Sequence, residues 1–354
     1  HRGPDGEGVW LHENEHVGLA HVRLSIIDLE SGQQPMLSNS KNAITYNGEI
    51  YNFEELKKEI GESNFTTNSD TEVILKAYEC WGVDCISKFR GMFAFALWDE
   101  SKSKLFCARD RFGIKPFYYT IVNDTFYCAS EIKALLPFVK EIDTDKDSLN
   151  DYLTFQFTLG EKTLFKGIKQ LEPGHFLTIE NSQISVKKYW EVYYNLDFRH
   201  TEQYFIEQTR ELMGDSIGLH LRSDVPVGAY VSGGRDSSIV AALASQIETS
   251  EFQAFTGKFS YGEGYDESMY ARDLSQQYSF NLHELDIKST DFVSSIHKII
   301  YHLDQPVAGP GSFPQYQISQ LASEHRKVVL GGQGGDEIFG GYARYLIAYF
   351  EQCI

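Results

Sequence analysis

The sequence predicts two domains of different fold class: an α+β sandwich over residues 1–195, followed by an α/β domain with a doubly wound parallel sheet over residues 201–354. Two observations predict this division. The first part carries short apolar or aromatic runs with turn residues between them, interrupted by two helical stretches. The second part alternates strand-like and helix-like stretches, which is typical of a parallel sheet.

In the first domain the predicted strands cover residues 43–46, 91–98, 104–108, 116–120, 125–129 and 175–179. The predicted helices cover residues 52–60 and 69–81. The second helix begins with Ser69-Asp70-Thr71-Glu72, which has the pattern of a helix N-cap.

In the second domain a helix is predicted to begin near Thr201, with an apolar face that includes Ile206 and Ile217. Predicted strands then cover residues 225–231, 253–259, 282–286 and 328–330. Predicted helices begin near Ser237 and Asp266 and cover residues 294–303. Parallel sheets bind ligands beyond the carboxyl ends of their strands, so the segments after residues 231 and 330 are the candidate site.

Charge and composition exclude several classes of function. The net charge is −18, with 50 acidic against 32 basic residues, which argues against binding to nucleic acid. The longest apolar runs are far too short to span a membrane, and the first residues do not resemble a signal peptide. The five cysteines form no Cys-x-x-Cys pair, which predicts free thiols in a reducing cytoplasm and neither a disulfide framework nor a cysteine metal site.

A glycine-rich loop, residues 232–238, follows the first predicted strand of the second domain and leads into a helix. Its two glycines let the backbone approach an anion, and the N–H groups at the helix start and the serine hydroxyls are donors. Asp236 beside a phosphate requires a cation, and Mg²⁺ bound with ATP is the obvious one. The loop lacks the Gly-Lys-Ser/Thr of a Walker A loop. A strand–loop–helix turn without a ligand is the alternative.

A second glycine-rich loop, residues 331–337, follows the last predicted strand and also carries an aspartate, Asp336. Two such loops at strand ends of one sheet can face one nucleotide and share its metal ion. This makes a purely structural role for both loops less favoured than a nucleotide site.

The two loops resemble those of a known family. Ser-Gly-Gly-x-Asp-Ser-Ser is similar to the pyrophosphate loop of the ATP-pyrophosphatase superfamily, and with Gly-Gly-Gln-Gly-Gly-Asp-Glu it resembles asparagine synthetases. The resemblance implies Mg²⁺ ligands at Asp236 and Asp336. It implies an ATP site formed by Val231, Ser232, Gly233, Gly234, Asp236, Ser237, Ser238, Gly257, Gly331 and Gly332. Gln333 stands where many members have an acidic residue thought to assist intermediate formation, and a glutamine cannot act as a base.

The resemblance extends over the first domain, where five motifs occur in the family's order: residues 2–6, 23–28, 46–52, 69–72 and 91–96. They are similar to a class II glutaminase domain, an N-terminal-nucleophile hydrolase with αββα layers. Glutamine is a zwitterion, so Arg23 suits its α-carboxylate, and Glu49 and Asp70 suit its α-ammonium. Asn47 and the Gly48 N–H suit the oxyanion of amide hydrolysis, and all of Arg23, Asn47, Gly48, Glu49 and Asp70 are expected to bind glutamine.

The resemblance implies glutamine-dependent synthesis of asparagine from aspartate, with ATP cleaved to AMP and pyrophosphate, and it suggests a homodimer. It also implies a nucleophilic cysteine upstream of His1 and a synthetase domain that continues beyond Ile354, so the chain is expected to be a fragment, inactive by itself as a glutaminase. Two alternatives stay open. One is a related amidotransferase or β-lactam synthetase-like enzyme with a different acceptor, and the other is a non-catalytic nucleotide-binding module.

Overall fold

The computed structural model describes residues 1–14, 16–248, 251–261, 264, 266–307, 309 and 311–353. The chain forms two compact units. The first contains His1–Leu196 together with Ile300–Ala308, and the second contains Asp197–Ile299 together with Gly309–Ile354. Residues 300–308, which the sequence-based boundaries assign to the second domain, therefore belong to the first unit.

The first unit is built from antiparallel sheets. Its largest sheet has six strands in the order β11-β10-β6-β5-β4-β3. These are β3 (Met36–Leu37), β4 (Ala43–Ile50), β5 (Gly91–Asp99), β6 (Lys104–Arg109), β10 (His175–Glu180) and β11 (Gln183–Lys188). A three-stranded sheet joins β7 (Tyr118–Val122), β8 (Thr125–Ala129) and β9 (Lys169–Gln170), and a hairpin joins β1 (Gly6–Leu11) and β2 (Gly18–Arg23).

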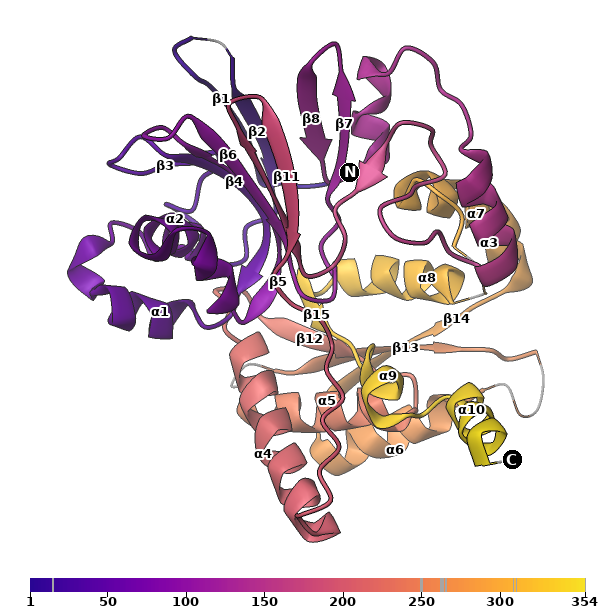
Figure 1. Ribbon diagram of the computed structural model, residues 1–354. Helices are drawn as coiled ribbons and strands as arrows, with labels where there is room; N and C mark the ends of the chain where they lie inside the picture. Colours follow the sequence, from indigo (N-terminus) through magenta and orange to yellow (C-terminus); the bar gives the residue numbers. More distant parts are fainter. Residues whose placement is uncertain are drawn as a thin grey trace. The chain divides into compact units, whose positions relative to one another are not determined.

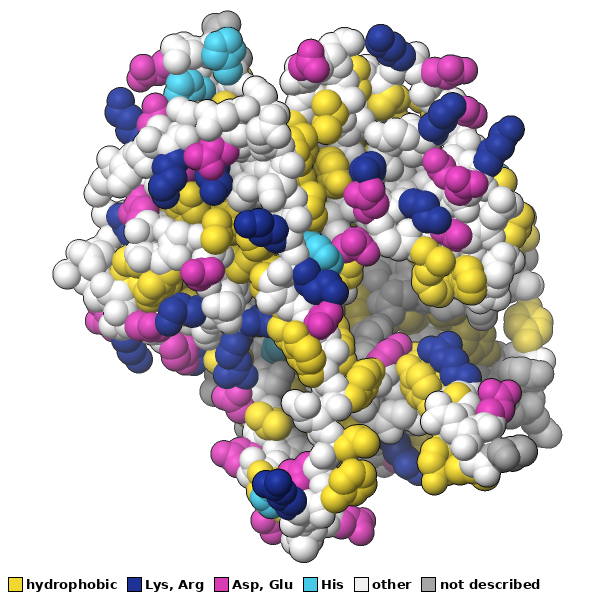
Figure 2. Space-filling model, viewed as in Figure 1, with side chains coloured by type: hydrophobic (Ala, Val, Ile, Leu, Met, Phe, Trp, Pro, Cys, Tyr) yellow, Lys and Arg dark blue, Asp and Glu magenta, His cyan; other side chains and the backbone are white. Residues whose placement is uncertain are grey.

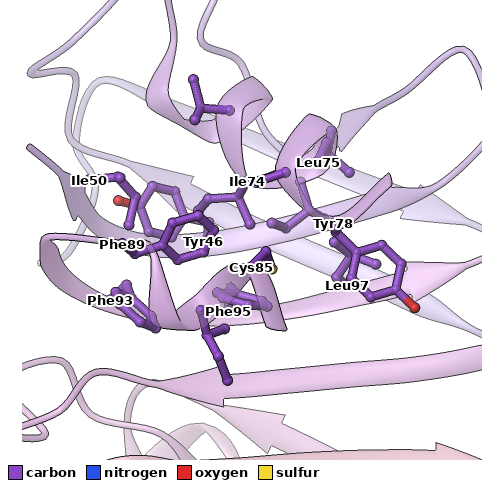
Figure 3. Packing of buried hydrophobic residues seen from close by; sticks show 14 of the residues in the cluster. Tyr46, Ile50, Ile74, Leu75, Tyr78, Cys85, Phe89, Phe93, Phe95 and Leu97 are labelled. Atoms are coloured by element: carbon purple, nitrogen blue, oxygen red, sulfur yellow. The ribbon is translucent and has the colours of Figure 1, made fainter. Parts of the chain in front are cut away.

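One face of the six-stranded sheet is covered by helices α1 (Phe53–Ile60) and α2 (Asp70–Trp81) (Figure 1). The 3₁₀ helix η1 (Glu62–Asn64) follows α1, and the 3₁₀ helix η2 (Gly82–Ser87) follows α2. Fully buried side chains from α2 and from β4 and β5, such as Ile74, Ile50 and Phe95, fill the space between the helices and the sheet (Figure 3). A second cluster on the opposite face joins Ala96 and Leu177 to Tyr119 of the three-stranded sheet. The two sheets therefore pack face to face.

Short 3₁₀ helices, η3 (Ile132–Ala134) and η4 (Leu136–Phe138), pack through Ile132 and Leu135 onto Tyr118 and Tyr127 of the three-stranded sheet. The helix α3 (Lys146–Phe155) follows them in sequence. The predicted α+β sandwich is confirmed: a helical layer, two sheet layers and a thin outer layer made of short helical turns. The hairpin β1–β2, the short strands and α3 escaped prediction.

The start of α2 is fixed by two side chains. Ser69 is the N-cap, and its hydroxyl accepts the N–H of Thr71 at 3.2 Å. Glu72 is buried, and its carboxylate accepts the N–H and hydroxyl groups of Thr66 and Thr67 at 2.6–3.1 Å. Burial acts to raise the pKa of Glu72, but these hydrogen bonds outweigh it and hold the pKa below its usual value.

Glu72→Gln is expected to destabilise the first unit by about 1–3 kcal/mol at pH 7, because an amide cannot replace a charged acceptor for four donors. The folded-state pKa is depressed, so this stabilisation is present above the unfolded-state pKa and is lost as the pH falls through the folded-state value. Urea unfolding at pH 7 and pH 3 measures the difference. Glu59→Gln, which removes an exposed ion pair with Lys88, is the control and should change stability by less than about 0.5 kcal/mol. A constant Glu72→Gln difference at both pH values would contradict the account.

The second unit is a four-stranded parallel sheet in the order β14-β13-β12-β15. The strands are β12 (Val227–Tyr230), β13 (Gln253–Lys258), β14 (Asn281–Asp286) and β15 (Val328–Leu330). The helices are α4 (Glu202–His220), α5 (Arg235–Ile247), α6 (Ser268–Tyr278), α7 (Ser289–Leu303), α8 (Ser312–Ser323), α9 (Gly335–Phe339) and α10 (Ala343–Cys353).

Helices cover both faces of this sheet. One face packs on α4, α5 and α6 through residues such as Ile217, Ala241 and Ala271, and the other packs on α8 through Ile318 and Ala322 (Figure 1). The predicted doubly wound sheet is confirmed. In the sheet, β12 has β13 on one side and β15 on the other. The chain runs from β12 to β13 and β14 in one direction and then returns to β15 on the opposite side of β12. The strand order therefore reverses between β12 and β15. Ligands of such sheets bind at this switch point, beyond the carboxyl ends of the strands.

The surface carries mixed charge. On the face shown in Figure 2, Lys and Arg side chains lie scattered among Asp and Glu. Among the described residues, no helix combines the length and apolarity needed to cross a bilayer. All the cysteines are free thiols. Cys85 and Cys107 are buried as core residues, whereas Cys80 of α2 is exposed.

Candidate functional site

Two of the predicted glutamine-binding carboxylates are held close together by the main chain of β4. Asp70, at the start of α2, is buried, and its Oδ2 accepts the Tyr46 hydroxyl at 2.8 Å and the Ile50 N–H at 3.0 Å. Ile50 follows Glu49 directly. Burial raises the pKa of Asp70 even though these hydrogen bonds oppose the shift. The structure therefore places Asp70 beside Glu49, with part of the Asp70 carboxylate already engaged by the fold.

Arg23 joins the same region through the loop that follows β2. Its Nη2 donates to the carbonyl oxygens of Ile27 and Asp28 at 3.0 and 2.6 Å. Asp28 in turn accepts the N–H of Asn68 at 2.8 Å, two residues before Asp70. A continuous set of hydrogen bonds thus links Arg23 to the start of α2. Arg23 Nη1 also donates to the Leu29 carbonyl oxygen at 3.4 Å, so loop carbonyls engage both terminal nitrogens of the guanidinium, and a substrate carboxylate would have to use the remaining N–H groups.

Gly48 lies where only a glycine fits. A Cβ there would lie 2.1 Å from the Met92 carbonyl oxygen and 2.7 Å from the Cα of Phe93. Phe93, opposite Gly48 in the β4–β5 ladder, donates its N–H to Asp110 Oδ2 at 3.2 Å and accepts the Asp110 N–H at 2.7 Å. Both backbone groups of Phe93 thus point away from β4, and the alternation of antiparallel pairs turns the Gly48 N–H away from β5. This N–H is free of the β4–β5 ladder.

Asn47 directly precedes Gly48 in β4 and carries a side-chain amide. Its Nδ2 donates to the hydroxyl of Ser130 at 3.3 Å, which restrains the rotation of the carboxamide. The two consecutive residues thus carry one side-chain donor and one backbone donor. Two fixed donors of this kind are what a developing oxyanion requires.

Several residues near these groups escaped the sequence reasoning. The Lys115 side chain is largely buried, which lowers its pKa, while the charge of Glu49 opposes the shift. Burial and the nearby Arg23 lower the pKa of His21 to about 4, so His21 is neutral at pH 7. Asp110, which accepts the N–H groups of Phe112, Ile114 and Lys115 at 2.9–3.1 Å, shapes the loop that carries Lys115. The sequence signal for the loop with Asp110 and Lys115 was the run Arg109-Asp110, followed by Gly113 and Lys115.

In the second unit, the loop after β12 is closed by its own serines. The Ser237 hydroxyl accepts the N–H of Ser232 at 3.1 Å, donates to the Gly234 carbonyl at 3.2 Å, and lies 3.0 Å from the Ser232 hydroxyl. Gly233 has a φ of +87°, a conformation that side chains disfavour. Ser238 donates its N–H to the Gly234 carbonyl in the first turn of α5. The loop is a tight cradle at a helix start, and Arg235 is exposed there.

The second loop packs directly against the first. A Cβ on Gly332 would lie 2.5 Å from the Ser237 nitrogen, and one on Gly335 would lie 2.3 Å from the Asp236 carboxyl carbon. Glycine is therefore required at both positions for the two loops to meet. The structure brings the predicted residues of the two loops together at the switch point between β12 and β15.

The carboxylates of Asp236 and Asp336 are the candidate ligands of Mg²⁺. The glycines beside them leave room for both, since a Cβ on Gly341 would lie 2.0 Å from Asp336 Oδ1. Magnesium is commonly held by one or two carboxylates, with phosphate oxygens and water completing six ligands. No cluster of three or more His, Cys, Asp or Glu occurs among the described residues. The residues present fit an ion that arrives with a nucleotide.

Three further predicted residues have identifiable surroundings. Val231 is buried and donates its N–H to the Phe255 carbonyl at 2.9 Å. Gly257 packs against the side chains of Ile287 and Ile318, so its lack of a side chain has a packing reason. Gln333 is exposed, and its Nε2 donates to Gln315 of α8 at 3.4 Å.

Comparison with known proteins matches both halves of the chain. Residues 1–190 match the glutamine amidotransferase domain family, and residues 208–353 match the asparagine synthase family. This order of domains defines a class of protein: a glutamine amidotransferase domain joined to a synthase domain.

Curated relatives narrow the class. The chain is 39% identical over 349 residues to glutamine-hydrolysing asparagine synthetase 1 of Bacillus subtilis, covering 98% of this chain and 54% of that protein. It is 38% identical over 376 residues to a protein named putative glutamine-hydrolysing asparagine synthetase 2 of Methanocaldococcus jannaschii, covering 99% of this chain and 72% of that protein. The chain belongs to the glutamine-hydrolysing asparagine synthetase family. It spans about half the length of the Bacillus relative. It is also 35% identical to Amidase chry2 of Gibberella zeae, covering 97% of this chain and 54% of that protein.

Proposed function

We propose that the protein to which this chain belongs makes asparagine from aspartate, taking the nitrogen from glutamine and cleaving ATP to AMP and pyrophosphate. The observation that carries the proposal is the joining of the two glycine loops at the switch point, where Gly332 and Gly335 pack on Ser237 and Asp236. Paired loops with one aspartate each suit a pyrophosphate group with Mg²⁺. Family membership supports this use of the site.

In this proposal the second unit activates the β-carboxylate of aspartate as an acyl-adenylate. The N–H groups at the start of α5 and the hydroxyls of Ser232 and Ser237 bind the pyrophosphate, and Asp236 and Asp336 hold Mg²⁺, which neutralises its charge. The substrate carboxylate oxygen attacks the α-phosphorus of ATP, and pyrophosphate leaves. Ammonia then attacks the acyl carbon, and AMP leaves.

The first unit supplies the ammonia. Arg23 pairs with the α-carboxylate of glutamine, and Glu49 with Asp70 binds its α-ammonium. Asn47 Nδ2 and the Gly48 N–H stabilise the oxyanion formed when the side-chain amide is attacked. Burial raises the pKa of Asp70, and the α-ammonium of a bound glutamine beside it would oppose this shift and favour the ionised carboxylate.

A different acceptor is the second candidate, because one relative is named an amidase. The test incubates the full-length natural protein with ATP, Mg²⁺ and ammonium chloride, and with either aspartate or other carboxylic acids. We expect AMP, pyrophosphate and asparagine in equal amounts with aspartate only. Release of AMP with another acid and not with aspartate would favour the second candidate. ATP binding without pyrophosphate release would favour a non-catalytic module.

A further inference from the structure

One short segment of the chain belongs to a different unit from its neighbours. Residues 300–307, called here the return segment, lie in the first unit, whereas the chain before and after them lies in the second. The segment includes the last turn of α7, which ends at Leu303, and it precedes α8, which begins at Ser312. Contacts that the segment makes with other residues of the first unit hold it there.

Asp304 is the anchor of the return segment. It has a left-handed backbone with φ of +65°, and its side chain is only 6% exposed. Its carboxylate accepts the N–H groups of Ile132 and Lys133 at 2.7 and 3.2 Å and pairs with the Lys133 ammonium at 2.7 Å. The carboxylate thus caps the first turn of η3. Such a charged, nearly buried set of hydrogen bonds is costly to break, because removing Asp304 would leave donors without an acceptor.

Contacts around Asp304 reinforce the anchor. The Lys133 ammonium also pairs with Glu131 at 3.0 Å and lies over the Tyr301 ring at 5.1 Å from its centre. Gln305 Oε1 accepts the N–H of Leu164 at 3.4 Å. Burial acts to lower the pKa of Lys133, but hydrogen bonds and charge from Asp304 and Glu131 raise it overall, so the Lys133 ammonium stays charged at neutral pH.

The anchor adjoins the predicted oxyanion site. Ser130, which accepts the Asn47 amide at 3.3 Å, lies two residues before Ile132. Glu131, between them, is also held by His1 and Arg2 at 3.0 and 3.4 Å. The position of Ser130 therefore depends on how η3 is held, and Asp304 holds η3.

We propose that Asp304 is a positioning residue for glutamine hydrolysis, which holds η3 and thereby Ser130 and the Asn47 amide. This inference rests on the proposed function and adds to it a residue that acts on the predicted oxyanion site through η3 and Ser130.

The test uses the full-length natural protein and the variants Asp304→Ala, Ser130→Ala and their double variant. For Asp304→Ala we expect kcat of glutamine hydrolysis to fall about tenfold, less than the 10²–10³-fold loss of a whole oxyanion donor, with KM unchanged. Asparagine formation from ammonia should be unchanged. Asp304→Asn keeps an acceptor oxygen and should lose less. The double variant should be no worse than the worse single variant.

Asp143→Ala, which removes an exposed ion pair with Lys166, is the matched control and should behave as the wild type. Wild-type glutamine hydrolysis in Asp304→Ala would overturn the proposal, as would losses that multiply in the double variant. An equal fall of ammonia-dependent synthesis would show a general folding defect and would overturn it too. If the wild type itself hydrolyses no glutamine, the proposed function fails. If it does so and Asp304→Ala hydrolyses glutamine equally fast, only the positioning role fails.

Discussion

Gly332→Ala is expected to weaken the binding of ATP with Mg²⁺ by about 100-fold and to abolish synthesis. A methyl group at this position would lie 2.5 Å from the Ser237 nitrogen and 2.9 Å from the Asp236 carbonyl carbon, so one of the two loops has to move. Both neighbours are backbone atoms at the start of α5, which cannot rotate aside. Overpacking costs about 1–3 kcal/mol, and each 1.4 kcal/mol corresponds to tenfold in affinity.

Isothermal titration of ATP with Mg²⁺ into the chain measures this effect. Gly218→Ala is the matched control, because a Cβ on Gly218 of α4 meets nothing within 4 Å. It should leave ATP affinity unchanged and stabilise the helix by about 0.5–1 kcal/mol. Equal affinities of the Gly332→Ala variant and the wild type would mean that the nucleotide does not use the junction of the two loops.

Asn47→Ala is expected to lower kcat for glutamine hydrolysis by about 10²–10³-fold in the full-length natural protein, because it removes one of two predicted oxyanion donors. Asparagine formation from ammonia should not change, since this step belongs to the other site. Glutamate release and asparagine formation, measured separately with glutamine and with ammonium, separate the two effects. Asn64→Ala, at an exposed turn where the side chain contacts only the Ile60 carbonyl, is the control. A fall in both activities would contradict the assignment of Asn47 to glutamine hydrolysis alone.

The sequence predicted what local patterns determine. Apolar runs with turn residues gave the central strands β4, β5 and β6, and the Ser69 pattern gave the start of α2. The alternation of strands and helices gave β12 to β15, because a buried parallel strand is a continuous apolar run. In contrast, α8 has the weakly periodic sequence SFPQYQISQLAS, so no helical pattern marks it. The hairpin β1–β2 is largely exposed, and among its residues only Leu19 is buried in the core, so its apolar pattern is weak.

The candidate site could be predicted as a set of residue types and not as a set of contacts. Glycine loops with aspartates indicate their chemistry by composition, and the meeting of Gly335 with Asp236 requires only that β12 and β15 be neighbours. The burial of Asp70 against β4 and the anchoring of Asp304 to η3 are different. They join residues up to 172 positions apart, and no local pattern records such a pairing.

The central claim is that nitrogen from glutamine reaches an acceptor activated by ATP. The most direct measurement uses the full-length natural protein with glutamine labelled with ¹⁵N in its side-chain amide, together with aspartate, ATP, Mg²⁺ and an excess of unlabelled ammonium. The account predicts ¹⁵N in the side chain of asparagine, with one AMP and one pyrophosphate formed for each asparagine. Label found only in free ammonia, or ATP cleaved to ADP and phosphate, would contradict it.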